Sequence, residues 1–142
     1  MPLEGLTEVN MNPLKESILE SVKNTLGIPT VYEHFDQQIL FHLNSVMSIL
    51  TQLGVGPSEG FIVENDIETW GDLIGDDVDK NRFLYVKSYV CLRVRLLFDP
   101  PTSSGGIEAM ERQMRELEWR ITVTHDIPCG TEDGEEVDTP DV

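Results

Sequence analysis

The sequence contains few cysteines, few basic residues and no long hydrophobic run, and each shortage excludes a class of protein. With 2 cysteines in 142 residues, no framework of disulfide bonds holds the fold, and a reducing cytosol is the expected compartment. No apolar run approaches the roughly 20 residues that span a bilayer, and the first residues lack the basic and then apolar pattern of a secretory signal. We therefore expect a soluble chain without a membrane partner.

Basic residues are scarce, because 10 Lys and Arg stand against 26 Asp and Glu, which gives a net charge of −16. A surface that binds nucleic acid needs clustered positive charge, so specific DNA binding is not expected.

The basic residues are concentrated in one part of the chain. Residues 79–121 hold 8 bases and 6 acids, whereas residues 1–78 hold 2 bases and 13 acids, and residues 122–142 hold 7 acids and no base. This distribution fits either pairing within the chain or contact between the basic region of one subunit and the acidic region of a neighbour.

Apolar residues recur every three or four positions along much of the chain, which predicts an all-α fold. The expected architecture is a small bundle of about four main helices, over residues 13–26, 36–53, 79–98 and 107–121. A long loop with a brief helix or turn at 69–74 is inserted between the second and third. Residues 1–12 form an N-terminal arm, 13–125 the helical domain and 126–142 an acidic C-terminal tail, whose composition alone predicts disorder.

The segment 79–98 is apolar on nearly every side, which is typical of a central helix. Cys91 lies in its apolar run and is interpreted as an inert core thiol. Arg93 and Arg95 are two residues apart and point in nearly opposite directions on a helix. At least one of them must therefore pair or extend out of the packed region.

The segment 107–121 carries an apolar stripe and three acid-before-base pairs four residues apart, which favours a solvated helix. The pairs are Glu108/Arg112, Glu111/Arg115 and Glu116/Arg120.

Trp119 lies off that stripe, on the same face as Glu108, Arg112 and Arg115. A tryptophan beside arginine is typical of interface hot spots. The alternative is that the segment 61–70 folds over this face and covers the indole.

One acidic stretch has part of the pattern of a calcium-binding loop but lacks two of its required residues. Asp77, Asp79 and Asn81 have the alternating spacing of calcium ligands. However, Arg82 stands where the loop needs glycine, and Ser88 stands where it needs a bidentate glutamate. We expect no calcium site here.

Ligands for other metals and groups for catalysis are not found at usable spacing. His34, His42 and His125 are far apart, with no cysteine or acid at ligand spacing beside them. No pair of catalytic groups has a recognisable arrangement. We expect no metal, no cofactor and no enzymatic activity.

Four short motifs, taken together and in this order, resemble the head-tail connector, or adaptor, proteins of long-tailed double-stranded DNA phages. The resemblance covers about residues 13–125. Each motif is weak alone, and the specificity comes from their order on an all-helical chain of this length. The motifs are Gln52-Leu53-Gly54-Val55-Gly56-Pro57, Trp70, Leu97-Phe98-Asp99-Pro100-Pro101 and Glu116-Leu117-Glu118-Trp119-Arg120-Ile121.

The resemblance implies a helical bundle whose copies form a ring, expected to be a dodecamer, beneath the portal. Such a ring extends the DNA channel, lets DNA pass without specific binding and supports the stopper or another tail-proximal neck protein. The location is the virion neck, and the host cytoplasm during assembly.

Two sets of residues are assigned to contacts on this basis. The residues expected at the interface between subunits are Arg93, Arg95, Arg112, Arg115 and Trp119. The resemblance also implies that the C-terminal segment docks on the portal, through Asp126, Ile127, Pro128, Glu132, Asp133, Glu135, Glu136, Val137 and Asp138.

Two other functions remain open at this point. One is a different neck protein, such as a head-completion or tail-completion factor. The other is a small regulatory or anti-host protein whose acidic tail mimics nucleic acid and sequesters a basic partner. The first would bind the tail terminator instead of the portal, and the second would be a monomer or dimer.

Overall fold

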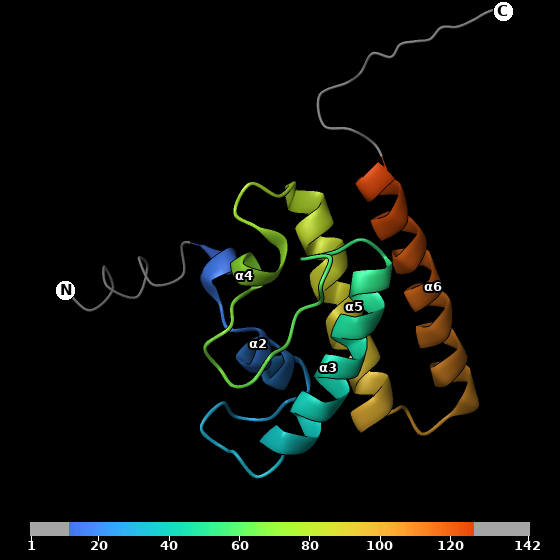
Figure 1. Ribbon diagram of the computed structural model, residues 1–142. Coiled ribbons are helices and arrows are strands. Elements are labelled where there is room, and N and C mark those ends of the chain that lie inside the picture. The colour runs from blue at the N-terminus through green and yellow to red at the C-terminus, as the bar shows by residue number, and fades with distance from the viewer. Residues whose placement is uncertain (1–11, 127–142) are drawn as a thin grey trace, which may run out of the picture.

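The computed structural model describes residues 12–126 and confirms an all-α bundle (Figure 1). No strand occurs within this region, where the only β-type pairing is an isolated bridge between Ser17 and Thr69. The elements in chain order are a 3-10 turn η1 (Pro13–Lys15) and the helices α2 (Ile18–Thr25), α3 (Asp36–Gln52), α4 (Trp70–Ile74), α5 (Lys80–Phe98) and α6 (Ser104–Asp126).

The first predicted helix, 13–26, is wrong as a single element, because the chain breaks between η1 and α2. Glu16 is extended, with φ −74° and ψ 146°. Ser17 then caps α2, since its side chain accepts a hydrogen bond from the Glu20 N–H at 3.2 Å. The freed backbone pairs with the segment before α4, through Ile18 N to Glu68 O at 2.9 Å. A Ser-x-x-Glu pattern at a helix start is a recognised signal that marks this second beginning.

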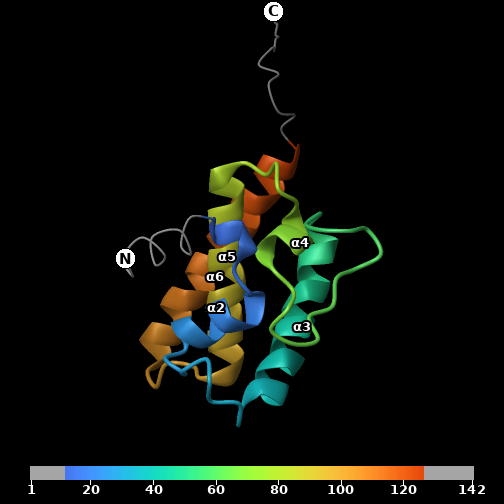
Figure 2. The same cartoon turned by 90° about the vertical axis from the view of Figure 1, so that its left-hand side faces the viewer.

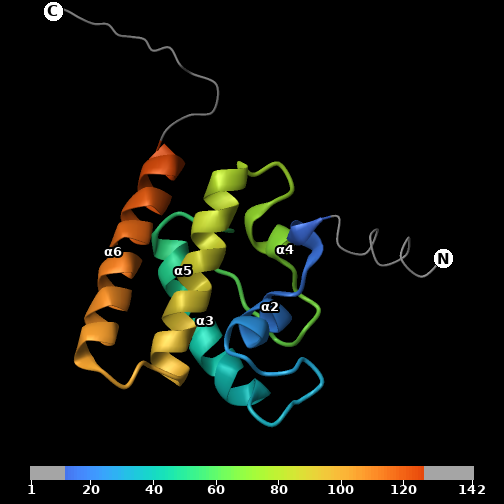
Figure 3. The ribbon, with the colours of Figure 1, turned by 180° about the vertical axis from the view of Figure 1, so that it is seen from behind.

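Helix α5 is the centre of the bundle, as its all-round apolar pattern predicts. It packs against α6, α3 and α2. Seen from behind, α5 lies between α2 on one side and α6 on the other (Figure 3). The core consists mainly of side chains from α2, α3 and α5, to which α6 contributes Met114, Leu117 and Ile121. Cys91 is among these core residues, as expected.

The insertion between α3 and α5 is anchored at three points. The backbone N–H and C=O of Val63 bond the Asn44 side chain at 2.8 and 2.9 Å. Thr69 forms a capping box with Asp72 at the start of α4. Trp70 is fully buried and donates its indole N–H to the Ser21 hydroxyl at 3.0 Å. This segment therefore packs on α2 and α3, and α4 matches the brief helix predicted at 69–74.

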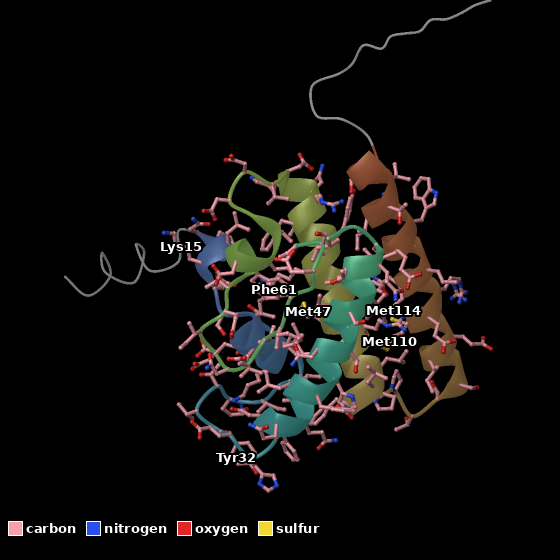
Figure 4. The ribbon with its side chains drawn as sticks, in the orientation of Figure 1. Lys15, Tyr32, Met47, Phe61, Met110 and Met114 are labelled. Carbon is pink, nitrogen blue, oxygen red and sulfur yellow. The ribbon has the colours of Figure 1, made fainter. Side chains whose placement is uncertain are left out.

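Helix α6 is longer than predicted at both ends, since it begins at Ser104 and includes Asp126. The sequence prediction begins this helix only at residue 107, after the glycines at 105 and 106. Instead, the Ser103 hydroxyl accepts a hydrogen bond from the Gly106 N–H at 3.0 Å and caps the first turn. Figure 4 shows Met110 and Met114 on the side of α6 that faces the other helices.

Candidate interaction surfaces

Trp119 is exposed on the outer face of α6, with 63% of its surface accessible. The segment 61–70, which was the alternative cover for this side chain, packs on α2 and α3 instead. Arg112 and Arg115 lie on the same face of α6 and are also exposed. An exposed tryptophan beside two exposed arginines has the composition of an interaction surface.

One of the three ion pairs predicted along α6 is present within residues 12–126. Arg120 reaches Glu116 at 2.7 Å, whereas Glu108/Arg112 and Glu111/Arg115 do not come within ion-pair distance in that region. Exposed pairs of this kind contribute only about 0.3–0.5 kcal/mol, so their absence costs the helix little. It leaves Arg112 and Arg115 available for other contacts.

Arg93 is held inside the protomer, where it helps to join α5 to α6. Its guanidinium lies 3.5 Å from the Glu118 carboxylate and over the ring of Tyr89. The Tyr89 hydroxyl donates to the same carboxylate at 2.7 Å. Burial, followed by the hydrogen bond to Glu118, raises the pKa of Tyr89 well above its ordinary value. Of the two arginines that had to point apart, Arg93 pairs and Arg95 is exposed.

Replacing Tyr89 with phenylalanine is expected to lower the free energy of unfolding by about 1.5 kcal/mol at neutral pH, through loss of one hydrogen bond to a charged group. Because the folded pKa is raised, the contribution of Tyr89 is complete below about pH 10 and declines as pH rises above it. Urea unfolding from pH 7 to 11 should show the two proteins converging at high pH. Tyr32→Phe, at an exposed ring, is the control, and a constant gap at all pH values would contradict this account.

Arg95 borders a shallow groove on the outer side of α5, between α2 and α6. The groove has a volume of about 430 Å³, and its lining includes Leu84, Lys87, Cys91 and Gln113. Leu84 is half exposed in this groove. Burial raises the pKa of the Cys91 thiol, which keeps the sulfur protonated and poorly nucleophilic at neutral pH. Cys91 is therefore a packing residue, as the sequence predicts.

The side of the protomer that lies away from α6, formed by η1, α2 and residues 66–69, carries an acidic hollow (Figure 3). A cavity of about 440 Å³ there is lined by the exposed Ile67 and by three acids and one base, among others. The acids are Glu16, Glu20 and Asp66, and the base is Lys15. Glu16 is paired with Lys87 at 3.4 Å. Within residues 12–126, no cation lies within ion-pair distance of Glu20 or Asp66.

Sequence reasoning missed two cations that bond within the protomer, the buried Lys23 and the partly buried Arg82. Lys23 is 1% exposed. Arg82 reaches from α5 to the end of α6, and burial lowers the pKa of its guanidinium. The sequence gives a partial indication that Lys23 is buried, because it lies four residues after Leu19 and therefore on the same, apolar face of a short amphipathic helix. Nothing in the sequence identifies the acceptors of either cation, since they are mostly backbone carbonyls of distant segments.

The remaining sequence expectations concern metals, membranes and the tail. The side chains that the structure places include no group of three or more residues able to hold a metal ion. None of the helices it describes is long and apolar enough to cross a bilayer. Of the residues assigned to portal docking, only Asp126 lies in the described region, as the last residue of α6. The other eight, from Ile127 to Asp138, lie outside it.

Comparison with known proteins gives one match. A family model with the description "Phage connector protein" matches residues 18–127, which span α2 to α6. Neither the curated proteins nor the solved structures provide a match.

Proposed function

Because the chain belongs to the phage connector protein family, we propose that its copies form a ring beneath the portal and extend the DNA channel. The family gives the chain a structural role in the neck of the phage particle. The observation that carries the finer proposal is the extent of the match, which covers nearly all of the helical domain. We propose twelve copies, to match a twelvefold portal, and a platform for the stopper or another tail-proximal protein. Assembly would take place in the host cytoplasm.

The charge of the chain favours a role as the wall of a DNA channel and disfavours a role in binding DNA. The net charge of −16 repels phosphate, and the three exposed arginines that have no ion pair within residues 12–126 lie on helix faces and not in one basic cleft. A wall of this kind lets DNA slide, because few counterions are released on contact.

Exposed basic side chains of α5 and α6 would join neighbouring copies. Arg93 is engaged with Glu118 of its own protomer, so this role passes to Arg95, Arg112 and Arg115. Trp119 adds an apolar anchor on the same side as the last two. Contacts of this type weaken as salt is raised, and a ring that assembled equally well in high salt would argue against a leading role for the arginines.

The acidic segment after α6 would dock on the portal. A variant that ends at Asp126 removes residues 127–142 but none of the helices that the structure describes. We expect it to keep the helical circular dichroism and thermal midpoint of the full chain and to lose co-sedimentation with the cognate portal. A second variant, with Glu132, Asp133, Glu135 and Glu136 changed to glutamine, tests whether the acids carry the contact. Portal binding that survived the deletion would overturn the docking role of this segment.

A further inference from the structure

We propose that the outer face of α6 in one copy docks into the acidic hollow formed by η1, α2 and residues 66–69 of the next copy. Trp119 would enter the hollow against Ile67, and Arg112 and Arg115 would meet Glu20 and Asp66. The proposal rests on the ring proposed above and specifies which two surfaces form its repeating contact.

The receiving surface combines a cavity, an apolar contact point and free negative charge. The cavity of about 440 Å³ is in the size range that receives small organic ligands, so it has room for an indole ring. Ile67 borders it and is 73% exposed. Glu20 and Asp66 have no ion-pair partner within residues 12–126. Glu16, which pairs with Lys87, and Lys15 also line the cavity, so its charged lining is three acids and one base and remains net negative.

The inserting surface has the complementary properties. Arg112, Arg115 and Trp119 follow a four and three spacing, which places them on one side of α6, and all three are exposed. Both arginines are without an ion-pair partner in the described region. Glu108 shares this face, which therefore carries two bases and one acid, and two copies that met through it would bring like net charges together. Like charges in contact are unfavourable, so a different, acidic surface is the better partner.

The positions of the two surfaces also suit a closed ring. In a head-to-tail ring of twelve, neighbouring copies differ by a rotation of about 30°, so the two contact surfaces of one copy must lie on nearly opposite sides. Helices α2 and α6 lie on opposite sides of α5 (Figure 3), and with the side that carries α2 and α4 toward the viewer, α6 lies behind the bundle (Figure 2). The hollow and Trp119 therefore lie where successive subunits would meet.

Exchanging the charges tests this pairing. Arg112→Glu with Arg115→Glu should abolish assembly, and so should Glu20→Lys with Asp66→Lys. A mixture of the two double variants should assemble again, because each mutated face then meets an opposite charge. Light scattering measures the mass in each case, alone and with the portal protein, after circular dichroism has shown that each variant is folded.

Replacing the anchor gives an independent measurement. Trp119→Ala should raise the concentration needed for half assembly by about 30-fold or more, as removal of an interface hot spot does. Phe41→Ala is the matched control, because Phe41 is an aromatic residue 71% exposed on α3, and its assembly should equal that of the wild type.

The outcomes separate this interface from the ring itself. Assembly that is unchanged in Trp119→Ala and in both charge variants overturns the interface and leaves the ring standing. Two charge variants that each fail to assemble and do not rescue one another also overturn the pairing. A wild-type chain that assembles neither alone nor on the portal overturns the ring, and this contact with it.

Discussion

Replacing Lys23 with methionine is expected to lower the free energy of unfolding by about 3 kcal/mol, because it removes one partner of a buried charge network. The ammonium lies 2.7 Å from the Asp36 carboxylate. It also donates to the carbonyls of Thr30 and Tyr32 at 3.0 and 2.7 Å. Lys23 thus fixes the loop between α2 and α3 to the start of α3. Methionine keeps most of the stem volume and leaves three acceptors without their donor.

Urea unfolding followed by circular dichroism measures this loss. The transition midpoint should fall while its slope stays the same, because the change in exposed surface is unaltered. Lys15→Met is the matched control, since Lys15 lies exposed on η1 (Figure 4), and its free energy of unfolding should stay within about 0.5 kcal/mol of the wild type. Equal stability of the two variants would show that the Lys23 network does not support the fold.

Replacing Arg82 with methionine should lower the free energy of unfolding by about 2 kcal/mol, since each hydrogen bond from a charged donor contributes about 1.5–3 kcal/mol. The guanidinium bonds the Ile121 carbonyl at 2.9 Å, the Thr124 hydroxyl at 3.0 Å and the Gly54 carbonyl at 3.3 Å. It therefore ties the last turns of α6 to the end of α3. Its loss should loosen the C-terminal part of α6 before the rest of the bundle.

Hydrogen exchange read by mass spectrometry locates the effect of the Arg82 change. Peptides that contain residues 118–126 should exchange faster in Arg82→Met, whereas peptides from α2 should keep wild-type rates. Lys80→Met provides the control, because that side chain is exposed on α5, the helix that carries Arg82. Uniform acceleration across the bundle would contradict a local role for Arg82.

The long helices were predictable because their signals are local. Helix α3 ends one residue before the predicted limit, next to Gly54, whose φ of 88° suits glycine. Helix α5 begins after Asp79, which caps it through the N–H groups of Asn81 and Arg82. In both cases a capping or terminating residue stands beside an unambiguous apolar pattern.

The errors arose where a distant segment decided the local structure. The apolar pattern of 13–26 continues through Ser17, but pairing of the backbone with residues 68–70 separates η1 from α2. The predicted start of α6, at residue 107, is too late, because the two preceding glycines argued against a helix and the capping by Ser103 was not recognised. Neither effect is visible in periodicity alone, since each depends on a hydrogen-bond partner and not on side-chain spacing.

The candidate interface was predictable in composition but not in detail. The position of Trp119 off the apolar stripe predicted either exposure or a cover, and only the packing of residues 61–70 on other helices decides between them. The charge pattern pointed to the arginines of 79–121 as a group. The structure divides them into two groups. Arg82, Arg93 and Arg120 bond to other groups of the protomer, whereas Arg95, Arg112 and Arg115 are exposed and have no ion pair within residues 12–126.

The mass of the purified protein by light scattering, alone and then with its cognate portal, tests the central claim most directly. The account predicts a ring-sized species, or a monomer that joins the portal in equal copy number. A small species that does not bind the portal would contradict the proposed ring. If that species bound the tail terminator, the chain would be a different neck component, and capture of a basic host protein would instead support the anti-host alternative.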